Sequence, residues 1–148
     1  GAFACAGASI AASDVGDGAV GLALLLADPE LDIDPGTTQF RLTVANGEDT
    51  IVDKDCTTLV TGTGRLDPKT GATIVKLKGL EDPSPTDTLS KFSFDSGRGT
   101  MRIAVGNASP ALPPGEAHVT VRLTVGARKY QTGVTLFERK PGSYSTRP

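Results

Sequence analysis

Few side chains in this sequence could carry out chemistry. His118 is the only histidine, and it lies in an alternating run of valines. A nucleophilic triad needs a histidine or an equivalent base, but a strand histidine at a packing position is the simpler interpretation. The carboxylate pairs Asp32/Asp34 and Asp53/Asp55 are spaced i,i+2, which places both members of each pair on one face of an extended chain. We therefore expect solvated acidic edges, no catalytic residues and no enzyme.

The acidic run from Asp28 to Asp34 has the spacing of a loop that binds a hard cation. Oxygen ligands recur at every second position, in Asp28, Glu30, Asp32 and Asp34. The run lacks the central glycine and terminal glutamate of an EF-hand, so a solvated loop is the simpler interpretation and calcium the alternative. Two cysteines and one histidine are too few for a structural zinc site. The glycine-rich turns lack the Gly-Lys-Ser/Thr end of a phosphate loop, so no cofactor is expected.

Cys5 and Cys56 are the only cysteines, and we predict that they form a disulfide. A composition rich in threonine and glycine is typical of exported all-β proteins, in which disulfides persist. Closing a loop of about 50 residues would stabilise the fold by about 4 kcal/mol in the chain-entropy description. Two free buried thiols are the alternative.

The strands that must position these residues follow an internal repeat. Three motifs recur at a constant offset of 81 residues: Asp14-x-Gly16-x-Gly18 with Asp95-x-Gly97-x-Gly99, Pro29-x-Leu31 with Pro110-x-Leu112, and Arg41–Val44 with Arg122–Val125. The match runs without gaps over about 30 residues. We predict two structural copies, about residues 1–81 and 82–148, the second shortened at its C-terminal end.

Alternating apolar and polar residues between Gly-, Pro- and Asp-rich turns predict about ten short strands. The expected strands are 1–13, 19–27, 38–45, 49–53, 57–66, 73–80, 91–94, 100–105, 118–126 and 130–138. No segment has a helical period. The predicted fold is all-β, an antiparallel β-sandwich in a single domain, residues 1–148. The nearly continuous apolar run 19–27 predicts a strand buried on both faces.

Residues 1–13 carry no charge, which leaves two alternatives for this strand. In the first it is an assembly strand, with Phe3, Ala8 and Ile10, that inserts into a neighbouring subunit. The open edge expected of the shortened second copy would accept it. In the second alternative the strand completes its own sandwich.

Charge is distributed unevenly along the chain. Residues 1–56 hold ten acidic and two basic side chains, whereas residues 57–148 hold seven acidic and thirteen basic ones. Either the two halves attract each other within one domain, or unlike ends favour head-to-tail contacts between copies. The net charge of −2 provides no basic field for nucleic acid. No run is long enough to span a membrane, and Ala2-Phe3-Ala4 resembles a cleavage site for export.

These features favour a structural role outside the cell. Threonine-rich repeats with Pro-Gly links and Asp-x-Gly-x-Gly hairpins are typical of secreted bacterial or archaeal surface proteins. We expect an extracellular or cell-surface protein that assembles with copies of itself into a filament or surface layer. A small-molecule ligand is not expected. The alternative is an adhesive or ligand-binding module of a larger surface protein, for which Tyr130 and Tyr144 are the candidate aromatic residues.

Overall fold

The computed structural model describes residues 2–27, 39–47, 49–56, 64–66, 68–69, 73–77 and 82–146. Within these residues every regular element is a β-strand. The described chain accordingly has no helix that is long and apolar enough to cross a membrane. The prediction of an all-β, antiparallel fold is confirmed.

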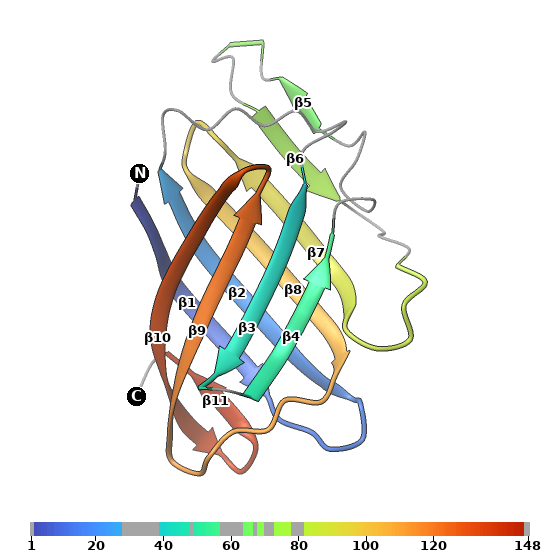
Figure 1. Ribbon diagram of the computed structural model, residues 1–148, viewed down its shortest axis with the longest axis vertical. Coiled ribbons are helices and arrows are strands. Elements are labelled where there is room, and N and C mark those ends of the chain that lie inside the picture. The colour runs from blue at the N-terminus through green and yellow to red at the C-terminus, as the bar shows by residue number, and fades with distance from the viewer. Residues whose placement is uncertain are drawn as a thin grey trace.

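Eleven strands form one antiparallel sheet, in the order β4-β3-β9-β10-β11-β1-β2-β8-β7-β6-β5 (Figure 1). Their bounds are β1 Ala2–Ala11, β2 Gly18–Ala27, β3 Phe40–Asn46, β4 Asp49–Asp55, β5 Gly64–Leu66, β6 Thr73–Leu77, β7 Thr88–Asp95, β8 Thr100–Ala108, β9 Glu116–Val125, β10 Arg128–Lys140 and β11 Ser143–Ser145. Most of them fall on the predicted runs, because alternation of apolar and polar side chains is a local signal.

The sheet curls over a single apolar core. Strands β9, β3 and β4 lie in front of β1, β2 and β8 in Figure 1, and buried residues from both groups belong to one cluster. Phe40 on β3 meets Phe92 on β7 edge to face, with ring centroids 5.3 Å apart. Six strands lie between β3 and β7 in the sheet order, so this contact closes the curled sheet across the core.

A short strand that the sequence did not predict makes the sheet continuous. β11 pairs with β10 on one side and with β1 on the other. It thereby joins β4-β3-β9-β10 to β1-β2-β8-β7, so that the layers are not the separate sheets of the predicted sandwich. β11 also pairs with β10, the last long strand of the second copy, whose shortened end was expected to leave an open edge. Among the described residues, the sheet order instead ends at β4 and β5.

Two strand pairings share the offset of the sequence repeat. On the first, between β2 and β8, Leu22 lies opposite Ile103. On the second, between β3 and β9, Leu42 lies opposite Leu123. Both pairs join residues that are 81 positions apart. All four side chains are buried in the core.

The N-terminal strand pairs within its own chain. β1 runs antiparallel to β2 from Ala2↔Ala27 to Ala11↔Ala19, with one bulge between Cys5 and Gly7. Ala8 and Ile10 are buried in the core. Phe3 packs against Tyr130 at a centroid distance of 5.6 Å. Within the single chain, β1 therefore pairs with both β2 and β11.

Candidate functional site

The outer face of β1, β2 and β8 carries mostly alanine, glycine and serine, with Leu25, Thr100 and Arg102 as larger exposed side chains. It was expected to be covered, because residues 19–27 are apolar at nearly every position. The structure corrects this: Val20, Leu22, Leu24 and Leu26 are buried, whereas alternate residues face outward and Leu25 is 45% exposed. Because the outward residues are mostly alanine and glycine, the run reads as apolar on both faces although only one face is covered.

An open groove of about 390 Å³ lies on this face. Its floor is formed by small residues of three strands, including Gly7, Ser9, Gly21, Ala23 and Ala104. A Cβ at Gly21 would lie 3.1 Å from the hydroxyl of Ser9, so the floor has little room for larger side chains there.

The charges that line the groove are both basic. Lys91 from β7 and Arg102 from β8 are exposed and belong to its lining. The groove therefore combines a flat, uncharged floor with a positive rim. Such a surface suits close contact with another flat surface, and its charge favours a partner that carries carboxylates.

The outer face of β3 and β4 carries the opposite charge. Asp49, Asp53 and Asp55 are exposed on β4. Arg41 donates two hydrogen bonds of 2.9 Å to the carboxylate of Asp53. The hydrogen bond from Arg41 lowers the pKa of Asp53 below its usual range, and the same bond raises the pKa of Arg41. β3 and β4 belong to the front layer in Figure 1, and β1, β2 and β8, which supply the floor of the groove, lie behind them.

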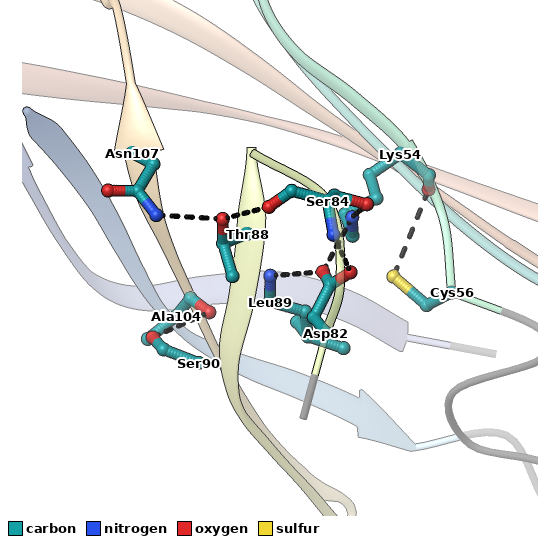
Figure 2. A network of polar contacts seen from close by, with 9 residues as sticks. All are labelled: Lys54, Cys56, Asp82, Ser84, Thr88, Leu89, Ser90, Ala104 and Asn107. Carbon is teal, nitrogen blue, oxygen red and sulfur yellow. Dashed lines mark hydrogen bonds and ion pairs between the residues drawn. The ribbon is translucent and has the colours of Figure 1, made fainter. Parts of the chain in front are cut away.

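A buried ion pair joins β4 to the segment that leads into β7. Lys54 Nζ lies 2.7 Å from Asp82 Oδ2, and the two side chains are 9% and 2% exposed. Figure 2 shows the Lys54 side chain reaching the Asp82 carboxylate, which also receives a hydrogen bond from the backbone N–H of Leu89. Lys54 alternates with Val52 and Cys56 on the inward face of β4. The sequence carried that signal, but the flanking aspartates made the run look solvated.

Backbone hydrogen bonds fix the carboxylate of Asp82 from two directions. Leu89 N donates to Oδ2 at 2.7 Å, and Ser84 N donates to Oδ1 at 3.0 Å. Burial alone would raise the pKa of Asp82, but the hydrogen bonds from Lys54, Leu89 and Ser84 outweigh it and hold this pKa well below its usual range. Lys54 Nζ also lies 3.3 Å from the hydroxyl of Ser84.

Further hydrogen bonds brace this segment against β8. Thr88 Oγ1 donates to the carbonyl of Ser84 at 2.7 Å and accepts from the side-chain amide of Asn107 at 2.9 Å (Figure 2). Asn107 adopts a positive φ of 50°, and its carbonyl accepts from Asp87 N. Asp82 is therefore held in place by the protein backbone and not by Lys54 alone.

The predicted disulfide is wrong in this structure, because Cys5 and Cys56 are free thiols. Cys5 lies on β1, whereas Cys56 directly follows β4, and four strands separate β1 from β4 in the sheet order. Cys5 Sγ donates to Gly7 O, and Cys56 Sγ contacts Lys54 O. Burial raises the pKa of both thiols, to about 11 for Cys56. Spacing along the chain could not reveal which strands the fold would place between them.

The other predicted residues lie in several environments. The calcium candidate, Asp28, Glu30, Asp32 and Asp34, falls outside the described residues. No cluster of potential metal ligands occurs in the part of the chain that is described. His118 was expected at a packing position but is exposed, with Nδ1 3.2 Å from Thr135 Oγ1. Tyr144 is buried, and its hydroxyl donates to the carbonyl of Pro113. Tyr130 packs against Phe3, so neither tyrosine presents an open aromatic surface.

Comparisons with protein-family models, with curated proteins and with solved structures found no match to this chain.

Proposed function

We propose that this protein is an exported, non-enzymatic structural subunit that assembles with copies of itself into an extracellular filament or surface layer. One observation carries the proposal. The groove with its basic rim lies on the outer face of one layer of the fold, and the acidic edge lies on the outer face of the other layer. Neither face resembles the other, so a contact between them joins unlike surfaces. Contacts of this kind propagate into chains of subunits unless the rotation between copies closes a ring.

The partner that suits the groove is the β3–β4 face of a second copy. Lys91 and Arg102 on the rim complement Asp53 and Asp55 on that face. Small side chains on the floor let a second sheet approach closely. The interaction of opposite charges would orient the approaching subunit, and its strength would decrease with added salt.

In this contact between the groove and the β3–β4 face, called surface contact below, β1 stays in its own sheet. Donation of residues 1–13 to a neighbour is the second route to a polymer. It would require β1 to leave both β2 and β11 and to expose the core positions of Ala8 and Ile10. The two routes therefore differ in what they demand of the monomer. Donation leaves the core positions of Ala8 and Ile10 empty in each unassembled subunit, whereas surface contact leaves them filled.

We also propose that the two halves of the chain are copies of one unit. Exchanging β1 with β7, β2 with β8, β3 with β9 and β4 with β10 reverses the order of each four-strand group and keeps every pair of neighbours within it. The register supports the same exchange. Thr43 and Arg122 lie opposite each other, and their counterparts 81 positions away, Thr124 and Arg41, also lie opposite each other. A two-layer fold built from two repeated units accounts for both the sequence matches and these pairings.

The assembly is tested by electron microscopy and sedimentation of the full chain at low and high salt. Ala23→Glu places a carboxylate on the groove floor and should abolish polymers. Ala111→Glu makes the same change at an exposed loop position and should leave them intact. Arg102→Glu and Asp55→Lys should each weaken assembly, and the double variant should restore it. Polymerisation of Ala23→Glu at the wild-type level would contradict the proposed contact.

A further inference from the structure

The buried pair of Lys54 and Asp82 brings a nucleophile and an acyl group together. An amine and a carboxyl group are the two halves of an amide bond. Here Nζ lies 2.7 Å from Oδ2, the distance of a charge-assisted hydrogen bond, so the amine is held against the carboxyl group. Reactants held at such distances gain an effective concentration that reaches about 10⁵ M or more in well-oriented cases.

The surroundings of the pair also suit condensation. The side chains are 9% and 2% exposed, so bulk water has little access to a bond formed between them. Leu89 N and Ser84 N each donate to one oxygen of the Asp82 carboxyl group. Backbone donors placed in this way polarise a carboxyl group and stabilise the negative charge that develops on its oxygen during attack.

We propose that Lys54 and Asp82 condense to form an intramolecular amide bond between β4 and the segment that precedes β7. A proton first passes from the Lys54 ammonium group to the Asp82 carboxylate, which gives a neutral amine and a neutral acid. The Nζ lone pair attacks Cγ of Asp82, and an N–Cγ bond forms. One Cγ–O bond then breaks, and its hydroxyl takes a second proton from Nζ and leaves as water.

This step balances without a co-reactant. The positive and negative charges of the ion pair cancel, one amide bond replaces one C–O bond, and nothing is oxidised or reduced. The first proton transfer opposes the hydrogen bonds that favour the carboxylate, so only a small fraction of the pairs is neutral and reactive at any moment. We therefore expect the bond to accumulate over time after folding and not during synthesis.

The bond would have a mechanical consequence. β4 lies at one end of the sheet order, and β7 lies near the other. An amide between Lys54 and Asp82 would tie these ends together covalently across the curled sheet. It would persist after unfolding, whereas the ion pair would not. This inference does not depend on the proposed assembly, because it concerns a bond within one chain.

The decisive experiment is intact-mass spectrometry of the full chain, reduced and then followed during incubation of the folded protein. The wild type should lose about 18 Da, the mass of the water released by amide formation. Tryptic digestion should yield one branched peptide that contains both Lys54 and Asp82. A folded wild type that keeps its full sequence mass after long incubation would overturn the proposal.

A matched variant separates the chemistry from the ion pair. Lys54→Arg keeps a positive charge on the same strand, but its guanidinium group does not attack a carboxyl group, so this variant should retain the full sequence mass. Loss of water at Asp17-Gly18 by succinimide formation would also lower the mass by about 18 Da, but it would persist in Lys54→Arg. The same loss in both proteins would therefore overturn the proposal. Asp82→Asn provides a second mass readout, because attack of Lys54 Nζ on the new side-chain amide would release ammonia, a loss of about 17 Da.

Discussion

Leu42 on β3 lies directly opposite Leu123 on β9, and 81 residues separate them in the chain. The same separation relates Leu22 on β2 to Ile103 on β8. In both cases the paired residues are separated by the offset of the sequence repeat. Both pairs are buried in the core, one in each layer of the curled sheet.

If the halves are equivalent units, equivalent core residues should contribute similarly to stability. We expect Leu42→Ala and Leu123→Ala each to reduce the free energy of unfolding by about 2–5 kcal/mol, because each leaves a cavity in the core. Their effects should not add, because the two side chains lie opposite each other. Urea denaturation of the single and double variants measures this. Val15→Ala is the control: at 76% exposure, Val15 should contribute less than about 0.5 kcal/mol.

Gly18 occupies a position at the start of β2 where no side chain fits. A Cβ there would lie 2.5 Å from Ala11 O and 2.7 Å from the side chain of Pro110. Gly18→Ala should therefore destabilise the protein by about 1–3 kcal/mol. Gly106 on β8 has no atom within 4 Å of the same position and a negative φ, so Gly106→Ala should be neutral or slightly stabilising. Equal urea midpoints for the two variants would refute the crowding at Gly18.

Both thiols should react slowly in the folded protein. Burial raises the pKa of Cys56 from 9.0 to about 11. Between these pH values the thiol of the folded state stays protonated, whereas the thiol of the unfolded state loses its proton. Its contribution to stability is therefore complete below pH 9 and is lost as the pH rises towards 11. Alkylation at pH 8 should be slow for Cys56 and fast after unfolding in urea. A non-reduced mass about 2 Da below the reduced mass would instead reveal a disulfide.

The two ion pairs of β4 should differ greatly in their effect on stability. Arg41 and Asp53 are about half exposed, so Arg41→Met should cost less than about 1 kcal/mol. Lys54→Met leaves the Asp82 carboxylate buried without a cation and should cost about 3–5 kcal/mol. Adding Asp82→Leu to Lys54→Met should recover part of that loss. Thermal and urea unfolding of the three variants decides this, and equal costs for Arg41→Met and Lys54→Met would contradict it.

Much of the strand content could be predicted from the sequence, because the alternation that marks a strand is local. Runs such as Phe40–Val44 and Val119–Val125 alternate buried and outward residues as predicted. β11 was missed because Ser143–Ser145 is too short to show a period. Its pairing with β1 and β10 exists only when both strands are already in place.

The sequence by itself determined that this chain is all-β, and it showed which motifs recur at an offset of 81. Only the tertiary structure decided that Lys54 meets Asp82, that Cys5 and Cys56 stay apart, and that one face of β2 is left open. These outcomes depend on which strands become neighbours across the curled sheet. Strand pairing between distant segments is set by the packing of the whole core, which no local pattern records.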